Sequence, residues 1–338
     1  MSAVQTVEVM PDEADLRLDR WFKRRFPGLS HARLSKLLRT GQIRVDGGRA
    51  KASLRLAAGN TVRVPPLGDE PAARSAPQKR PAYTPSEQQF ETARRWVIHR
   101  DDAIIALNKP PGLAVQGGSE VEEHLDALLD GLRFGAPERP RLVHRLDRDT
   151  SGVIVLARSA EAARRLTEAF RQRAPRKVYW ALVIGVPHPL SGRIDAALAK
   201  RPGAGGEKMR VAGKGDDGQG ATTFYRVIDS APPRAAWLAL MPKTGRTHQL
   251  RVHCAEVLGT PIAGDGKYGG VAAFLPLEGV EKRLHLHARA LELPDLKDPS
   301  GRRVLRLVAE LQPHMTKSFK LLGFDLNLAR DPFAALEP

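Results

Sequence analysis

The sequence has almost no cysteine and no long apolar run. Cys254 is the one cysteine among 338 residues, so no disulfide can form within the chain, which fits a reducing compartment. No stretch reaches the apolar length of a membrane-spanning helix, and the first residues lack the basic start and apolar run of a signal peptide. We therefore expect a cytoplasmic protein that does not contact a membrane.

Several motifs of common enzyme classes are also missing. No Gly-x-x-x-x-Gly-Lys-[Ser/Thr] segment occurs, which excludes a P-loop nucleotidase at the level of motifs. The stretch His144-Arg-Leu-Asp is faintly like the catalytic loop of protein kinases, but the downstream Asn, the Asp-Phe-Gly element and the glycine-rich loop are absent from the sequence. A zinc deaminase needs a cysteine pair, which one cysteine cannot supply.

Acidic residues are scarce relative to basic ones. The chain has 38 Asp and Glu against 54 Lys and Arg, a formal net charge of +16 at pH 7. An excess this large favours a polyanionic partner, most often nucleic acid, although an arginine-rich proteome is an alternative explanation. An anionic membrane is disfavoured because the sequence has no basic amphipathic helix or lipidation motif.

A segment rich in proline and small polar residues, residues 67–92, divides the chain. It has hardly any large apolar side chains, so it cannot bury a core and is expected to be a semi-extended linker. We therefore predict a small domain over residues 1–66 and a large domain over residues 93–312. A C-terminal tail is predicted over residues 313–338.

The small domain concentrates the positive charge. From Arg17 to Arg63 there are 13 Lys and Arg against two acids. Apolar residues at four-residue spacing from Leu18 predict one helix, and Ser30 is a good N-cap for a second helix, which Gly41 ends. Packing these helices would gather their off-face cations on one surface suited to RNA phosphates, whereas an ordinary solvated surface usually interleaves acids. These cations are Arg20, Lys23, Arg24, Arg33, Lys36, Arg39 and Arg44.

This region resembles the RNA-binding domain of ribosomal small-subunit protein four, the S-four domain. The stretches that carry the resemblance are Leu18-Asp-Arg-Trp-Phe, Ser30-His-Ala-Arg-Leu-Ser-Lys-Leu-Leu-Arg-Thr-Gly-Gln-Ile-Arg-Val-Asp-Gly and Lys51-Ala-Ser-Leu-Arg-Leu-Ala-Ala-Gly-Asn-Thr-Val-Arg-Val-Pro. The family usually has Asn where Asp46 stands. The resemblance implies a small αβ domain that binds RNA.

The large domain alternates short apolar runs with turns. Strand-like runs such as Ile104-Ile-Ala-Leu and Val153-Ile-Val-Leu-Ala outnumber helical stretches, so we predict an α+β domain on a mixed, mostly antiparallel sheet. Apolar spacing predicts a helix after Ser159 and another over residues 250–258. Residues 201–219 are rich in glycine and charge and are predicted to form a mobile loop.

The stretch of residues 141–158 runs from a polar, charged loop into a buried strand, which is a common place for catalytic groups. Asp147 has Arg145 and Arg148 on either side. Their guanidinium groups would favour the ionised carboxylate that a nucleophile or general base needs. From these residues alone, a structural ion pair within a turn is equally consistent with the pattern.

His144-Arg-Leu-Asp-Arg-Asp-Thr-Ser-Gly resembles the central motif of the RluA family of pseudouridine synthases. The resemblance extends from about Trp96 to Val308, through stretches that follow the family's order. These are Asn108-Lys-Pro-Pro-Gly-Leu-Ala-Val, Lys177-Val-Tyr-Trp-Ala-Leu-Val, Thr244-Gly-Arg-Thr-His-Gln-Leu-Arg-Val-His, Gly264-Asp-Gly-Lys-Tyr-Gly and Leu284-His-Leu-His-Ala. Together with an S-four-like domain, this order is similar to the family's large-subunit ribosomal RNA branch.

The resemblance implies that Asp147 is the catalytic aspartate of an enzyme that isomerises uridine in RNA. Arg251 matches the arginine that pairs with this aspartate, and Tyr179 matches the tyrosine that stacks on the target uracil. Substrate-binding roles are expected for Arg145, Arg148, Lys177, Arg246 and His248.

The spacing of these residues agrees with the implied roles. Arg251 is next to the apolar stripe of Leu250 and Cys254, so it leaves the helix beside the buried face, where its fork could hold a carboxylate. Lys177 and Tyr179 are two residues apart and point to one face of a strand, where an aromatic ring can receive an unstacked base. The alternatives are that Arg251 is an ordinary surface arginine and that Tyr179 is an ordinary core tyrosine.

The implied reaction breaks the N-glycosidic bond, turns the bound uracil and joins its C5 to the same ribose carbon. No group enters or leaves overall, so we expect no cofactor and no metal. His285 and His287 share one strand face and could ligate a metal, but with no acidic or cysteine partner nearby we favour structural or RNA contacts.

Some alternatives stay open from the sequence. The aspartate could attack the sugar carbon or remove a sugar proton. The expected partner is large-subunit ribosomal RNA. We expect a monomeric enzyme that modifies this RNA during ribosome assembly. A tRNA pseudouridine synthase is the nearer alternative, and a non-catalytic ribosomal RNA-binding assembly factor is the more distant one.

Overall fold

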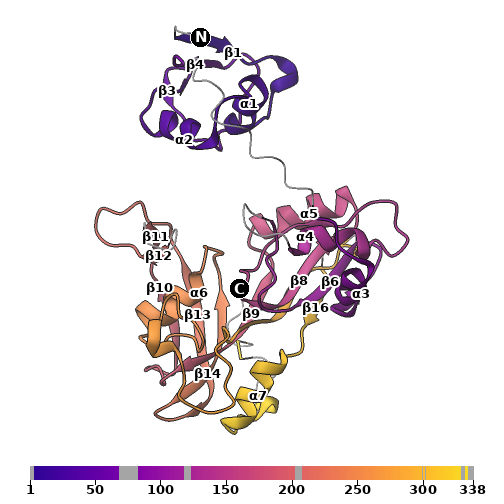
Figure 1. Ribbon diagram of the computed structural model, residues 1–338, viewed down its shortest axis with the longest axis vertical. Helices are drawn as coiled ribbons and strands as arrows, with labels where there is room; N and C mark the ends of the chain where they lie inside the picture. Colours follow the sequence, from indigo (N-terminus) through magenta and orange to yellow (C-terminus); the bar gives the residue numbers. More distant parts are fainter. Residues whose placement is uncertain are drawn as a thin grey trace. The chain divides into compact units, whose positions relative to one another are not determined.

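The computed structural model describes residues 4–67, 83–117, 123–201, 208–298, 300, 302–328 and 332–333. The chain divides into two compact units, Met1–Ala82 and Tyr83–Pro338, and each has its own apolar core (Figure 1). Across these described ranges, no helix is both long enough and apolar enough to cross a membrane.

The first unit packs two helices against a small antiparallel sheet. The helices are α1 (Leu18–Arg25) and α2 (His31–Arg39), preceded by a 3-10 turn, η1 (Pro11–Glu13). The strands, in their order across the sheet, are β1 (Gln5–Glu8), β4 (Thr61–Val64), β2 (Arg44–Val45) and β3 (Gly48–Arg49). Trp21 and Phe22 of α1 are fully buried in the core of this unit.

Local sequence signals act in this unit as predicted. The hydroxyl of Ser30 accepts a hydrogen bond of 3.3 Å from the backbone N–H of Arg33 and caps α2. Gly41 follows the helix with a left-handed φ of +70°. Asp46, with φ +49°, forms the turn between β2 and β3, and its carboxylate accepts a 2.7 Å hydrogen bond from the backbone N–H of Thr61. The Asp46 side chain therefore ties this turn to β4.

The second unit is built on one large mixed sheet. Its strands are β5 (Val97–Arg100), β6 (Ile104–Lys109), β7 (Arg141–Leu142), β8 (Ser151–Ala157), β9 (Arg176–Ile184), β10 (Ser191–Asp195), β13 (Thr222–Ala231), β14 (Ala235–Pro242), β15 (Leu286–Pro294) and β16 (Val304–Val308). In the part of the chain that the structure describes, their order is β10-β13-β14-β9-β15-β8-β6-β5, with β16 beside β15 and β7 beside β8. β15 and β8 run parallel, and the other neighbouring strands in this order run antiparallel. This confirms the predicted α+β fold with a mixed, mostly antiparallel sheet.

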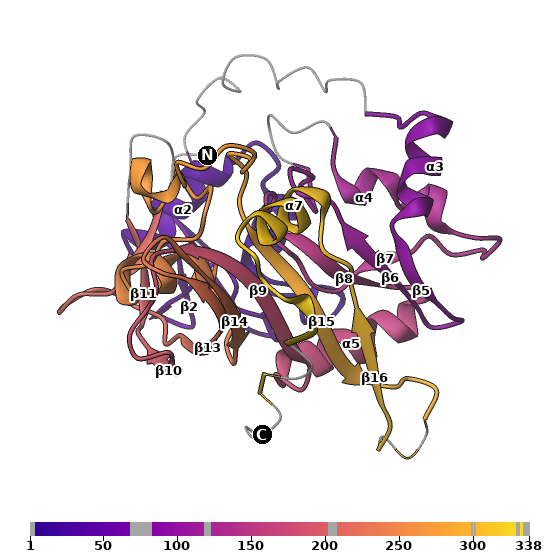
Figure 2. The same cartoon turned by 90° about the horizontal axis from the view of Figure 1, so that it is seen from below.

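Helices cover both faces of this sheet. They are α3 (Glu87–Arg95), α4 (Leu125–Leu128), α5 (Ala160–Arg171), α6 (Gln249–Val252) and α7 (Pro313–Leu321), with short turns η2 (Leu129–Leu132), η3 (His253–Val257, a π-helical turn), η4 (Gly270–Ala273) and η5 (Leu326–Leu328). Alternate residues of β6 and β8 face opposite cores, one with α3 and α4 and the other with α5. In Figure 2, α5 and α7 lie on opposite sides of the sheet.

Both boundaries of the large domain differ from the sequence prediction. The predicted linker ends at residue 92, but α3 begins at Glu87, where Ser86 and Gln89 form a capping box. Phe90 packs against the core, so the linker prediction is wrong from Glu87 to Thr92. The cause is that the proline-rich stretch is followed directly by a helix start signal, which its composition concealed. Residues 68–82 lie outside the described residues.

The predicted C-terminal tail is also wrong over α7. Met315 and Phe319 of this helix are fully buried in the core of the second unit. The ring of Phe319 lies 5.2 Å from that of Trp237 on β14. An apolar pair at four-residue spacing therefore makes α7 part of the large domain rather than an appendage.

The predicted loop over residues 201–219 contains a strand. β11 (Leu198–Arg201) pairs antiparallel with β12 (Lys208–Val211), while residues 202–207 lie outside the described residues. The backbone N–H of Val211 donates a 2.8 Å hydrogen bond to Glu256 of η3. This bond fastens β12 beside the helical segment that follows residue 248.

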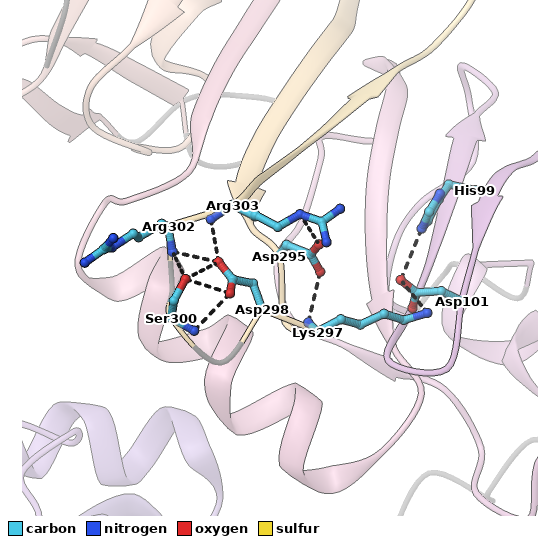
Figure 3. A network of polar contacts seen from close by, with 8 residues as sticks. All are labelled: His99, Asp101, Asp295, Lys297, Asp298, Ser300, Arg302 and Arg303. Carbon is cyan, nitrogen blue, oxygen red and sulfur yellow. Dashed lines mark hydrogen bonds and ion pairs between the residues drawn. The ribbon is translucent and has the colours of Figure 1, made fainter.

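A polar network joins the β15–β16 connection to the β5–β6 turn (Figure 3). Lys297 Nζ lies 3.9 Å from Asp101 Oδ2. The other carboxylate oxygen of Asp101, Oδ1, accepts two backbone hydrogen bonds of 2.8 Å in the turn. Asp298 accepts backbone hydrogen bonds from Arg303 (2.7 Å) and Arg302 (2.8 Å), and the bond from Arg303 contributes most to lowering the pKa of Asp298 to about 2. We regard this network as a structural brace.

Candidate active site

Asp147 lies in the loop of residues 143–150, which joins β7 to β8 and is anchored first by His144. The Nε2 atom of His144 accepts a 2.8 Å hydrogen bond from the backbone N–H of Val155, and its ring stacks on Phe170 at 4.5 Å. Burial lowers the pKa of His144 to about 3, so the ring is neutral at pH 7. Leu146 is buried in the core on the near side of Asp147. The loop therefore enters the site on the half-buried His144 and the buried Leu146.

Lys109 anchors the other side of the loop. It is fully buried, and its Nζ donates hydrogen bonds to the carbonyls of Pro110 (2.9 Å), Leu113 (2.9 Å) and Arg148 (3.0 Å). Arg148 returns a 3.1 Å hydrogen bond from Nε to the carbonyl of Gly112. Burial lowers the pKa of Lys109 to about 7, against the charges of nearby aspartates. The residue after Asp147 is thus held by an ammonium group and a neighbouring loop.

The loop leaves the site through Gly152, which has a left-handed φ of +108°. A Cβ at this position would lie 2.3 Å from the carbonyl oxygen of Ala288, so only glycine allows this approach of β8 to β15. Beside it, Ser151 Oγ and His287 Nδ1 are hydrogen-bonded at 2.9 Å. The parallel strand pair therefore fixes where the Asp147 loop ends.

Asp147 opens onto a pocket of about 480 Å³, which we call the first pocket. It collects all the predicted catalytic and substrate-binding residues except Arg148. These are Asp147, Tyr179, Arg251, Arg145, Lys177, Arg246 and His248.

Tyr179 and Lys177 lie on the same face of β9, as their spacing predicts, and both line the first pocket. Burial raises the pKa of Tyr179, with a smaller contribution from the charge of Asp147, so the phenol is neutral. Lys177 Nζ lies 5.8 Å from the centre of the Phe170 ring, and burial lowers its pKa. The wall of the pocket therefore combines a neutral aromatic ring with a positive group.

Arg251 is held by Asp265 and not by Asp147. Its Nε and Nη2 donate hydrogen bonds of 2.8 and 2.7 Å to the two carboxylate oxygens of Asp265, and both side chains are buried. The structure describes no hydrogen bond or ion pair between Arg251 and Asp147, and their direct pairing stays a prediction. Burial opposes the charge of Arg251, but the bonds to Asp265 raise its pKa overall, and Asp147 adds to this effect. Sequence spacing could not reveal Asp265, because a turn brings it to the helix.

His248 lies directly before α6 with a left-handed φ of +54°. Such a backbone conformation is uncommon for a non-glycine residue and is often found at functional sites. Its Nε2 lies 3.8 Å from Asp147 Oδ2, and its Nδ1 lies 2.6 Å from Tyr268 Oη. Burial lowers the pKa of His248, and the charge of Asp147 opposes that shift. The ring therefore bridges Asp147 and Tyr268.

The loop before His248 is organised by the buried amide of Gln249. Its Oε1 accepts hydrogen bonds from Thr244 Oγ1 (2.7 Å) and from the backbone N–H of Arg246 (3.1 Å). Its Nε2 donates to the carbonyl of Thr222 at 2.9 Å. These bonds present Arg246 and His248 to the first pocket from a fixed loop.

A second pocket, also of about 480 Å³, shares Asp147, His248 and Arg251 with the first pocket. Its remaining charged residues are Arg148, Asp149, Lys267, Lys282 and Arg283. It depends on Gly264, where a Cβ would lie 1.8 Å from the carbonyl oxygen of Arg283. Asp147 therefore lines both a pocket with an aromatic wall and a pocket rich in cations.

His285 and His287 make structural contacts. His285 is hydrogen-bonded to Ser318 Oγ at 2.8 Å, and His287 to Ser151 Oγ and to the carbonyl of Ala309 (3.2 Å). Burial lowers the pKa of each to about 4. Within the described ranges, no group of three or more His, Cys, Asp or Glu side chains is arranged to hold a metal ion.

The cations predicted for the first unit are exposed, except that Arg33 is half-buried. Arg24 forms a 2.9 Å ion pair with Asp12, and Arg44 donates to the carbonyls of Gly41 and Gly47. Arg25 differs, because it pairs at 2.7 Å with the buried Glu13. Chiefly through its hydrogen bond to Arg25, Glu13 has its pKa lowered to about 2. Arg25 is therefore part of the fold of this unit.

Four residues that hold the site have no role predicted from the sequence. They are Lys109, His144, Asp265 and Tyr268. Each lies within a stretch that carries the family resemblance, and this was the available signal. Their roles depend on contacts over distances such as the 39 residues between Lys109 and Arg148. Spacing along one element cannot predict such contacts.

Comparisons with known proteins show to which family the chain is similar. A family model described as RNA pseudouridylate synthase matches residues 103–256, which include Asp147, Tyr179 and Arg251. The chain is 36% identical to "RNA pseudouridine synthase 4, mitochondrial" of Arabidopsis thaliana, over 95% of this chain and 82% of that protein. It is 34% identical to ribosomal large subunit pseudouridine synthase C of Salmonella typhimurium, over 95% of this chain and 97% of that protein.

A solved structure is similar as well. That of human RNA pseudouridylate synthase domain containing 4 matches with a TM-score of 0.58 and 33% identity, and covers 71% of this chain and 97% of that one.

Proposed function

This chain belongs to the RNA pseudouridylate synthase family, and on that premise we propose that it converts specific uridines of large-subunit ribosomal RNA to pseudouridine, with Asp147 as the catalytic carboxylate. The observation that carries the proposal is that Asp147 lines both the first and the second pocket. A carboxylate placed there can act on a ribose while the base lies in one pocket and the phosphates lie in the other.

The reaction breaks the bond between ribose C1′ and uracil N1 and forms a bond between C1′ and C5. The hydrogen on C5 leaves to solvent, and N1 gains a proton. The balance needs no oxidant, reductant or transferred group. Asp147 either attacks C1′ or removes a proton from the sugar, and both routes need the carboxylate in its ionised form.

Tyr179 is proposed to receive the uracil. Its neutral ring forms part of the wall of the first pocket, and an aromatic face can stack on a base taken out of its helix. Extruding a base costs a few kcal/mol. Phosphate contacts from Arg145, Lys177 and Arg246 would offset that cost, since all three line the pocket.

The substrate assignment rests on two supports. One relative is named a ribosomal large subunit pseudouridine synthase, and nearly all of its length is covered. The other is the exposed cation group of the first unit: Arg20, Lys23, Arg24, Lys36, Arg39 and Arg44, with the half-buried Arg33 beside them. We further propose a monomer that acts in the cytoplasm during assembly of the large subunit. The single cysteine supports a reducing compartment.

The test compares Asp147→Asn with the wild type on a large-subunit RNA fragment labelled with tritium at uridine C5. Asn keeps the shape of the side chain and loses its charge, so tritium release should fall by at least about 100-fold while RNA affinity is retained. Asp102→Asn, a change at a fully exposed carboxylate outside both pockets, serves as the control. Turnover of Asp147→Asn near the wild-type rate would show that Asp147 is not the catalytic carboxylate.

Substrate choice is tested separately by mapping pseudouridines in total RNA with and without the gene. Loss of sites in large-subunit RNA is the expected result. Loss confined to tRNA would favour the alternative substrate.

A further inference from the structure

Tyr268 connects several parts of the site without reaching Asp147 itself. Its Oη lies 2.6 Å from His248 Nδ1, and it accepts a hydrogen bond of 3.2 Å from the backbone N–H of Met209 on β12. Its ring lies 5.0 Å from Cζ of Arg251. Its own backbone N–H donates to Asp265 at 3.3 Å. The phenol is therefore held from several directions.

The donors and acceptors at Tyr268 Oη can be assigned from these contacts. A backbone N–H can only donate, so the bond from Met209 uses a lone pair of the phenol oxygen. Among the contacts described for this oxygen, His248 Nδ1 is the one acceptor that the hydroxyl hydrogen can reach, and we direct the hydrogen to it. A neutral imidazole that accepts at Nδ1 carries its proton on Nε2.

The ring of His248 is neutral at pH 7, because burial lowers its pKa. Several charges also surround it. Asp147 and Asp265 raise the pKa of His248, and Arg251 and Lys267 lower it further. The Nε2 atom, which carries the proton in this assignment, is the atom that faces Asp147 Oδ2 at 3.8 Å.

We propose that Tyr268 is a positioning residue whose hydroxyl fixes the tautomer and orientation of His248, so that the Nε2–H of His248 points at the Asp147 carboxylate. The proposal rests on the proposed catalytic role of Asp147. At 3.8 Å the contact is longer than a hydrogen bond, and catalytic contacts of this kind often shorten when the substrate binds. An N–H donor on one carboxylate oxygen would leave the other oxygen free to face the ribose.

The backbone of His248 supports a positioning role. With φ +54° the residue occupies a strained conformation that its surroundings must maintain. Two contacts beyond it do so: the amide network of Gln249 and the hydroxyl of Tyr268. The backbone N–H of Met209, on β12 of the β11–β12 pair, donates to the same hydroxyl and so limits its rotation.

The first experiment measures the tautomer directly in the full chain, by the ¹⁵N chemical shifts of histidine side chains. The His248 signals are assigned by their loss in His248→Gln. In the wild type at pH 7.5 we expect a protonated Nε2 and an unprotonated Nδ1. In Tyr268→Phe, which removes only the hydroxyl, the shifts should move toward the average of two tautomers. Protonation at Nδ1 in the wild type, or unchanged shifts in the variant, would overturn the proposal.

The second experiment measures kinetics. Loss of one neutral hydrogen bond predicts that Tyr268→Phe lowers kcat about fivefold to tenfold while KM changes by less than about twofold. In a His248→Ala background the same substitution should have no further effect on kcat, because its target is gone. Equal effects in both backgrounds would mean that Tyr268 acts independently of His248 and would reject the idea.

A matched control is Tyr225→Phe, which removes a buried hydroxyl bonded at 3.0 Å to the carbonyl of Pro189, outside both pockets. Its kcat should equal that of the wild type. A fall like that of Tyr268→Phe would show that loss of a hydroxyl in this domain suffices, and would overturn the assignment. If the wild type itself isomerises no RNA, the proposed function fails, while the tautomer measurement still decides the hydrogen-bond assignment.

Discussion

Arg251 and Asp265 form a two-bond ion pair in which the Arg251 side chain is 8% exposed and the Asp265 side chain 1% exposed. The pair occupies one edge of the arginine fork, so Arg251 is already bound to a carboxylate of its own. The charge of Asp147 adds to the raised pKa of Arg251, so Asp147 lies beside a positive group that is already fixed in place.

The first prediction concerns the geometry of this pair. Arg251→Lys keeps the charge but cannot form both bonds, so it should lose most of the isomerisation activity and also lower stability. Asp265→Ala should cost about 3–5 kcal/mol in the free energy of unfolding, because it leaves a buried charge without its partner. Urea titration measures the stability and tritium release the activity.

Asp130→Ala is the control for the Asp265 substitution. Asp130 pairs with Arg133 and Arg139 at the surface, so its loss should cost no more than about 1 kcal/mol. Full activity of Arg251→Lys together with an inactive Arg251→Ala would show that bare charge suffices and that the planar fork is not needed.

A second prediction concerns Gly152. An added methyl group would meet the Ala288 carbonyl, and the left-handed φ would be strained, so Gly152→Ala should destabilise the second unit by at least about 2 kcal/mol. Gly220→Ala is the matched control, since a Cβ there meets nothing within 4 Å. Equal urea midpoints for the two variants would contradict the packing argument.

A third prediction concerns acid stability and the buried histidines His285 and His287. Burial lowers each folded-state pKa to about 4, below the unfolded value near 6.5. Unfolding therefore takes up protons as the pH falls below about 6.5, and the stability present above that pH is lost down to about pH 4. Each histidine should account for roughly 2 kcal/mol between pH 7 and pH 5.

The measurement for this third prediction is urea unfolding at pH 7 and pH 5, for the wild type and for His285→Gln. The variant should lose less stability between the two pH values, because one titrating group is gone. A drop of the same size in both proteins would show that His285 does not contribute.

The fourth prediction separates the two units. A protein that begins at Tyr83 should fold, because α3 and its capping box are then intact and Gln89 keeps its hydrogen bond to the Tyr83 hydroxyl. A start at Glu91 would cut α3. The truncated protein should bind ribosomal RNA more weakly, with a raised KM and a largely retained kcat.

Salt titrations decide whether the first unit touches RNA. Each phosphate contact that is lost should lower the log–log salt slope by about 0.9 for a duplex or about 0.7 for a single strand. An unchanged slope on a large-subunit fragment would mean that the first unit does not bind this RNA. It would then serve another transcript or a protein partner.

Sequence patterns were sufficient where a feature depends on neighbours along one element. The shared face of Lys177 and Tyr179 follows from strand alternation, and the start of α2 from the side chain of Ser30. They were insufficient where packing decides. Asp265 reaches Arg251 through a turn, and the composition of residues 67–92 hid the start of α3.

The two pockets that meet at Asp147 also bear on which uridines the site accepts. A base in the first pocket does not fill the second pocket, where the cations Lys267, Lys282 and Arg283 lie. A free nucleotide carries its phosphates on one ribose oxygen and has no neighbouring nucleotides with which to occupy this second set. A uridine inside a strand brings flanking phosphates with it. The shape of the site therefore favours uridine in a polymer over the abundant monomers of the same base.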